Sequence, residues 1–118
     1  ENAQIKKLEQ IFHKIPFMTK ALGQLRINKA KCLLYSGIYN NLTGRKGKAE
    51  TDFVKCIELA GKHRQPYELG RAYYELGLLL GYREGRDYLS QAAEIFEGVK
   101  TPYELEQVRA ALAGQDEE

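Results

Sequence analysis

The tetrapeptide PYEL occurs twice in this chain of 118 residues, at positions 66–69 and 102–105. A recurrence at one offset constrains the fold only if the apolar pattern around it recurs at the same offset. Ahead of the first copy, small and apolar residues stand four, three and four positions apart, which is the spacing of one face of an amphipathic helix. Positions 36 further on carry a similar set, so the pairs are Ala49 and Gly85, Phe53 and Leu89, Cys56 and Ala92, Ala60 and Phe96.

The apolar pattern also recurs after PYEL. One helical face carries Leu69, Ala72 and Leu76, and at the offset of 36 it carries Leu105, Val108 and Leu112. Pro66 and Pro102 each stand where a helix can begin, because the first turn needs no backbone N–H from its first residue. These recurrences predict a repeat whose unit is a helix, a turn and a second helix.

The pattern predicts an all-α fold of about six helices, at roughly 2–14, 18–42, 46–63, 66–80, 84–98 and 102–113. Glycine pairs at 44 and 47 and at 81 and 85 mark the turns inside two antiparallel hairpins. We divide the single predicted domain, 1–118, into an N-terminal helix (1–17), a first hairpin (18–65), a second hairpin (66–101) and a final helix with an acidic tail (102–118). Because the sequence does not begin with Met, we expect it to be part of a longer protein.

The helix predicted at 18–42 has one face expected to point inward. That face consists of Leu22, Leu25, Ala30, Leu33, Gly37 and Ile38. The helix predicted at 2–14 has a corresponding apolar face made of Ile5, Leu8 and Phe12.

Charge and hydropathy make several classes of protein improbable. The 18 basic and 16 acidic residues leave a net charge of +2, whereas nucleic-acid-binding domains usually carry a clear basic stripe. The longest apolar run, at 76–82, is too short to span a bilayer, and no secretory signal is visible. We therefore expect a cytoplasmic protein without a membrane segment.

The two cysteines, Cys32 and Cys56, both lie within apolar helical patterns. Their scarcity favours a reducing compartment over a disulfide framework. We expect both to be small buried thiols where helices approach each other. A disulfide between them and a zinc site completed by His63 are the alternatives, although no metal-binding signature supports the second.

The residues of both units resemble the tetratricopeptide repeat, a helix hairpin of about 34 residues. The first unit matches the family pattern with Leu33, Ser36-Gly37, Gly44, Ala49, Phe53 and Cys56, and the second with Tyr73, Leu76-Gly77, Gly85, Leu89 and Ala92. The stretches YELGRAYYELGLLL and YLSQAAEIFE are similar to helical-repeat arms of bacterial signalling proteins and transcription regulators.

The second unit departs from the family in length. Gly37 and Cys56 are 19 positions apart, whereas Gly77 and Ala92 are 15 apart. About one helical turn is therefore missing near position 80. Either this hairpin is short, or a loop is missing from the sequence.

The resemblance implies a right-handed superhelix whose concave face is lined by the first helix of each hairpin. Aligning Gly37 with Gly77 implies a groove lined by Lys31, Leu34, Ile38, Asn41, Arg71, Tyr74 and Leu78. Such a groove suits a peptide with an apolar anchor and an acidic group. The alternative is that this stripe is core, covered by the N-terminal helix or by a neighbouring repeat.

The resemblance implies a protein–protein interaction or regulatory scaffold module within a larger signalling protein. Self-association through the end faces of the array is one alternative, and an RNA-binding superhelix is another. The sequence has no Walker loop and no Gly-x-Ser-x-Gly elbow, and His13 and His63 each stand alone near a predicted helix end. We therefore expect no catalytic residues, no bound metal and no cofactor.

Overall fold

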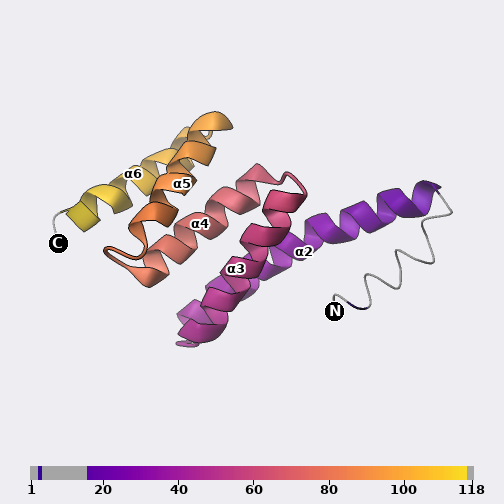
Figure 1. Ribbon diagram of the computed structural model, residues 1–118, viewed down its shortest axis with the longest axis horizontal. Coiled ribbons are helices and arrows are strands. Elements are labelled where there is room, and N and C mark those ends of the chain that lie inside the picture. The colour runs from indigo at the N-terminus through magenta and orange to yellow at the C-terminus, as the bar shows by residue number, and fades with distance from the viewer. Residues whose placement is uncertain (1–2, 4–15, 117–118) are drawn as a thin grey trace.

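The computed structural model describes residue 3 and residues 16–116, and the described residues are helical and contain no strand (Figure 1). The helices are α2 (Pro16–Leu42), α3 (Lys46–Lys62), α4 (Pro66–Leu80), α5 (Arg86–Gly98) and α6 (Pro102–Asp116). The predicted all-α class is confirmed. Except for residue 3, the helix predicted at 2–14 lies outside the described residues, so the number of six helices stays a prediction.

The helix boundaries differ from the predicted ones by at most three residues. Helix α2 begins at Pro16, two residues before the predicted start at 18. A proline is accommodated there because the first helical turn has no intrahelical partner for that residue's N–H group. Helix α5 begins two residues later than predicted, and α6 continues to Asp116.

The helices pack mainly on their neighbours in the chain. Each consecutive pair from α2 to α6 is in contact, and α2 also contacts α4. Figure 1 shows α2 and α6 at opposite ends of the arrangement, with α4 between them. The molecule is accordingly elongated, with extents of 55 × 32 × 18 Å.

Residues that correspond at the offset of 36 are also similarly buried in the structure. The buried positions on α3, namely Ala49, Phe53, Cys56 and Ala60, correspond to buried positions Gly85, Leu89, Ala92 and Phe96 at the start of α5 and within it. On the following helices, Ala72 and Val108 correspond and are also fully buried. The positions paired at this offset are thus buried in both predicted units.

The two turns that lead into PYEL have the same backbone geometry. After α3, the N–H of Gln65 donates to the carbonyl of Ala60 at 2.9 Å, and after α5 the N–H of Thr101 donates to that of Phe96 at 3.1 Å. The residues just before them, Arg64 and Lys100, have φ angles of 54° and 57°. Both helices therefore end in a left-handed residue that reverses the chain into the next helix.

The core consists of two clusters that meet at α4. Buried residues of α2, α3 and α4 form the first, and Leu89, Ala92, Phe96 and Val108 of α5 and α6 form the second.

Hydrogen bonds between side chains also join α2 to α3. The Asp52 carboxylate of α3 accepts hydrogen bonds from Ser36 Oγ at 2.7 Å and from Asn40 Nδ2 at 2.9 Å, both on α2.

Glycines allow the helices of each hairpin to approach closely. A Cβ atom on Gly37 would lie 2.4 Å from the Phe53 ring. In the second hairpin, a Cβ atom on Gly85 would lie 2.0 Å from the carbonyl oxygen of Gly77. Residues 81–85 close this hairpin, and Gly81 supplies a φ of 79°. This connection has five residues, against three between α2 and α3, so the missing turn is accounted for by an earlier end of α4 and a later start of α5.

Candidate interaction surface

Most of the exposed large apolar side chains of the described residues lie on α2, α4 and α6. Among the described residues, the large apolar side chains exposed on α2, α4 and α6 are Tyr35, Tyr39, Leu42, Tyr67, Leu78 and Tyr103. Outside these helices, Val54, Tyr82 and Val99 complete the set of exposed large apolar residues in the described part of the chain. The surface suited to an apolar partner therefore lies mainly on α2, α4 and α6.

The seven residues predicted to line the groove differ in their exposure. Lys31 and Leu78 are exposed, Ile38, Asn41, Arg71 and Tyr74 are partly exposed, and Leu34 is buried with 2% of its surface exposed. Leu34 belongs to the first core cluster, together with Ala72 and Leu76 of α4. Because α4 packs beside α2, Leu34 contributes to the core and is not available to a partner.

The α2 residues of the predicted set have local partners of their own. The side-chain oxygen of Asn41 accepts a hydrogen bond from Lys46 Nζ across the turn between α2 and α3. Ile38 packs against the first core cluster. Only Lys31 of this group presents an exposed side chain.

Arg71 lies on α4 between a phenol and a carboxylate. Its Nη1 donates to Tyr67 Oη at 3.4 Å, and its Nη2 is 3.5 Å from Glu75 Oε2. Its Nε is buried and has no hydrogen-bond partner among the described residues. Burial lowers the pKa of Arg71, whereas Tyr67 and Glu75 raise it, and the net change is upward. The guanidinium therefore stays charged, and its one donor nitrogen without a partner in the described part of the chain, Nε, is enclosed by the protein.

Tyr74 lies where α4 approaches α6. Its ring packs against the second core cluster, and its phenol interacts electrostatically with that of Tyr103. Burial raises the pKa of Tyr74, Glu75 and Tyr103 raise it further, and Arg71 partly opposes them. The Tyr74 phenol thus keeps its proton at neutral pH and can donate a hydrogen bond.

Tyr67 and Tyr103, the tyrosines of the two PYEL segments, were not among the predicted site residues. Tyr103 accepts a hydrogen bond from Gln107 Nε2 at 3.4 Å, in the same arrangement as Tyr67 and Arg71 one unit earlier. The Tyr67 ring is also tilted by 59° against Phe96, with 6.3 Å between their centroids. The recurrence of PYEL was the sequence signal that could have identified both tyrosines.

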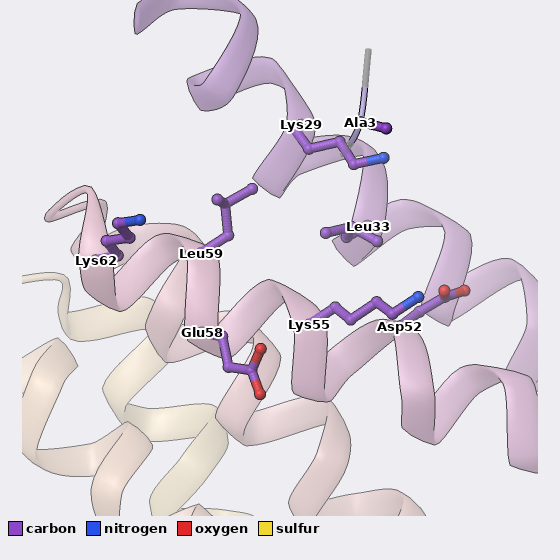
Figure 2. Close-up of a pocket in the computed structure, with 8 residues that line it drawn as sticks. All are labelled: Ala3, Lys29, Leu33, Asp52, Lys55, Glu58, Leu59 and Lys62. Atoms are coloured by element: carbon purple, nitrogen blue, oxygen red, sulfur yellow. The ribbon is translucent and has the colours of Figure 1, made fainter. Parts of the chain in front are cut away.

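A hollow of about 650 Å³ lies between α2 and α3, away from the predicted set. Figure 2 shows Leu33 of α2 and Leu59 of α3 on its two sides, with the Lys29 side chain extending toward Ala3. Its lining is otherwise charged and includes Asp52, Lys55, Glu58 and Lys62. None of the seven predicted groove residues lines this hollow.

The two cysteines have different environments. Cys56 is fully buried, and its thiol donates to the carbonyl of Ala30 at 3.3 Å. Burial, with a smaller effect from Glu68, raises its pKa to about 12. Cys32 is free and exposed, so the prediction that both thiols are buried is wrong for Cys32. A helical residue two positions from Ala30 and from Leu34 lies on the opposite side from both, which explains its exposure.

Among the described residues, no three His, Cys, Asp or Glu side chains are grouped so that they could hold a metal ion. Within the same part of the chain, each helix is too short or too polar to cross a bilayer. Comparison with known proteins gave no matching family model, no matching curated protein and no matching solved structure.

Proposed function

We propose that this chain is a tetratricopeptide-like interaction module of a larger cytoplasmic signalling protein, and that it binds a peptide or protein segment rather than catalysing a reaction. The observation that supports this proposal is the concentration of exposed apolar side chains on α2, α4 and α6. These side chains are the apolar contacts that the described surface offers to a partner.

The binding surface centres on α4. Leu78, with 45% of its surface exposed, offers an apolar contact, and Arg71 offers a partly exposed guanidinium. Tyr74, on the same helix, offers an aromatic ring and a phenol that keeps its proton at neutral pH. A segment that combines an apolar anchor with an acidic group matches this arrangement.

The test begins with selection of 12-residue peptides from a random displayed library on the immobilised 118-residue chain. Synthetic copies of the selected peptides are then titrated against wild type, Arg71→Glu/Tyr74→Ala and Arg71→Glu/Leu78→Ser. We expect both variants to lose binding by about tenfold or more, because each removes a cation and an apolar contact together. Since Tyr74 packs against the second core cluster and Leu78 is exposed, the second variant separates lost binding from lost stability.

The matched control is Lys55→Glu/Val54→Ala, which makes the same kinds of change at exposed positions of α3. This control should bind the selected peptides like wild type. Peptides whose affinity is the same for wild type and for Arg71→Glu/Leu78→Ser would contradict the proposed surface.

Self-association is a second candidate function, and the surface of α6 disfavours one way of achieving it. On α6, the positions equivalent to Gly70, Tyr73 and Gly77 of α4 carry Glu106, Arg109 and Ala113, which are all exposed. A copy stacked on α6 as α5 stacks on α4 would bury two charged side chains at a cost. Light scattering after gel filtration across a range of concentrations distinguishes a dimer from a monomer.

A further inference from the structure

One face of α2 carries a stripe of exposed apolar side chains. Cys32, Tyr35, Tyr39 and Leu42 follow one another at spacings of three, four and three residues, and all four are exposed. The exposed fractions of Tyr35, Tyr39 and Leu42 are 61%, 59% and 80%. These four residues are called the α2 seam below.

The α2 seam lies opposite the residues through which α2 joins the core. Ala30 and Leu34 are buried in the first core cluster with residues of α3 and α4. Successive residues of an α-helix advance by about 100°, so Cys32 is turned by about 200° from Ala30, and Tyr39 by about 180°. Figure 1 shows α2 at one end of the arrangement. The seam is therefore accessible to a second molecule.

The α2 seam lies in the longest uncharged stretch of the chain. Residues 32–44 contain no Lys, Arg, Asp or Glu. A surface helix usually carries charged residues on the face away from the core, and α3 does so with Glu50, Lys55 and Glu58, which are all exposed. The central parts of protein interfaces are instead depleted of charge and enriched in tyrosine. The α2 seam thus has the composition of an interface.

The spacing and the lack of charge indicate which partner covers the α2 seam. Alternating spacings of three and four residues are those at which side chains of two packed helices interlock. A second copy of the chain supplies a helix with the same seam, and such an interface joins one patch to itself across a twofold axis. Two copies do not repel each other along residues 32–44, and a charged partner would find no opposite charge there.

The size of the α2 seam determines how strongly two copies pair. Asn28, the next position at this spacing, is polar, so the apolar part begins at Cys32 and rises by about 15 Å to Leu42. A buried aromatic side chain covers about 150–250 Å², so the exposed part of each seam tyrosine offers roughly 100 Å². Two seams together bury less than the roughly 1,200 Å² of a stable complex. The dimer is therefore weak and forms only in concentrated solution.

We propose that the chain forms a weak homodimer in which the α2 seams of two copies pack on each other. The inference goes beyond the proposed peptide surface, because the residues of that surface, Arg71, Tyr74 and Leu78, all lie on α4.

The test is the mass of the 118-residue chain by static light scattering at concentrations from about 5 to about 500 µM. We expect the mass to rise from 13.5 kDa toward twice that value, because association follows mass action. Tyr35→Glu/Tyr39→Glu places four like charges in the interface and should remain monomeric. The matched control, Val54→Glu/Tyr82→Glu, changes two exposed apolar residues outside the seam and should dimerise like wild type.

The reaction of Cys32 with a thiol reagent follows the same equilibrium without any substitution. Cys32 is exposed in the monomer and belongs to the seam, so its reaction should be rapid in dilute solution and at least about twofold slower at the highest concentration. In Tyr35→Glu/Tyr39→Glu the rate should be the same at all concentrations.

A mass that stays constant for wild type, or equal self-association of wild type and Tyr35→Glu/Tyr39→Glu, would overturn the inference. A Cys32 that reacts slowly at every concentration would also overturn it, in favour of a segment of the same chain covering the seam. Arg71→Glu/Leu78→Ser should dimerise like wild type, and a monomer there would assign the contact to α4 instead. If wild type dimerises through the seam and no library peptide binds, the proposed function fails and this inference stands.

Discussion

At the scale of single residues, Cys56 and Cys32 differ in the access that water has to them. We predict that a thiol reagent modifies one cysteine of the native chain rapidly, namely Cys32, and the second only after unfolding. Both thiols should be found free once the chain is denatured without reductant. One reactive thiol or none after denaturation would contradict the assignment of both cysteines as unpaired.

The raised pKa of Cys56 predicts that folding stability depends on pH. The folded chain keeps this thiol protonated up to about pH 12, whereas an unfolded cysteine loses its proton above about pH 9. Folding stability should therefore fall as pH rises from 9 toward 12, because the unfolded state alone releases the proton. Cys56→Ala should lose less stability than wild type between pH 8 and pH 10 in thermal melts. This substitution should be tolerated because Ala92 occupies the equivalent position on α5.

Gly85 and Gly77 allow the closest approach of α4 and α5. A methyl group on Gly85 would overlap the carbonyl of Gly77, and backbone atoms cannot move aside as a flexible side chain can. We expect Gly85→Ala to lower the free energy of unfolding by about 3 kcal/mol or more. The control is Gly61→Ala in α3, where a Cβ atom meets nothing within 4 Å. It should raise stability by about 0.5–1 kcal/mol through helix propensity. Urea unfolding followed by circular dichroism measures the stability of both variants. Equal stabilities of Gly85→Ala and Gly61→Ala would contradict the close approach of Gly85 to Gly77.

At the scale of elements, α3 and α5 end in the same way without the glycine that such ends usually use. Arg64 and Lys100 adopt left-handed φ angles, which cost a residue with a Cβ atom roughly 1 kcal/mol. Arg64→Gly and Lys100→Gly should therefore each raise the free energy of unfolding by up to about 1 kcal/mol. Lys62→Gly, two residues earlier in the last turn of α3, should instead lower it by about 1 kcal/mol. A loss of stability in Arg64→Gly, measured by thermal melting, would refute the assigned helix end.

The helices themselves could be predicted because proline and glycine mark where they begin and turn. Pro66 and Pro102 are the first residues of α4 and α6, as the sequence indicates. The spacing of apolar residues predicted less well how deeply a given side chain is buried by the neighbouring helix. Leu34 and Tyr74 are equivalent in sequence, yet Leu34 is buried and Tyr74 remains partly exposed. The difference depends on how closely the next helix packs, which a single sequence does not encode locally.

The exposure of the candidate site residues was predicted only in part for a related reason. Lys31 and Leu78 are exposed as expected and Leu34 is buried, whereas the exposed Tyr67 and Tyr103 were not in the predicted set. Tyrosines beside apolar positions resemble residues that fill seams between helices, so the pattern alone assigns them to packing. The hydrogen bonds from Arg71 and Gln107 distinguish them, and those bonds depend on the side-chain conformations as well as on the spacing.

At the scale of the whole molecule, the contacts between consecutive helices also determine how the chain can reach its folded state. Apart from the packing of α2 on α4, the main interactions of the described helices join elements that are adjacent in the chain. Such a molecule closes only short loops as it forms, so little entropy is lost before each contact is gained. We therefore expect rapid folding, on the microsecond-to-millisecond scale typical of low contact order, that can begin at either hairpin and spread to the other.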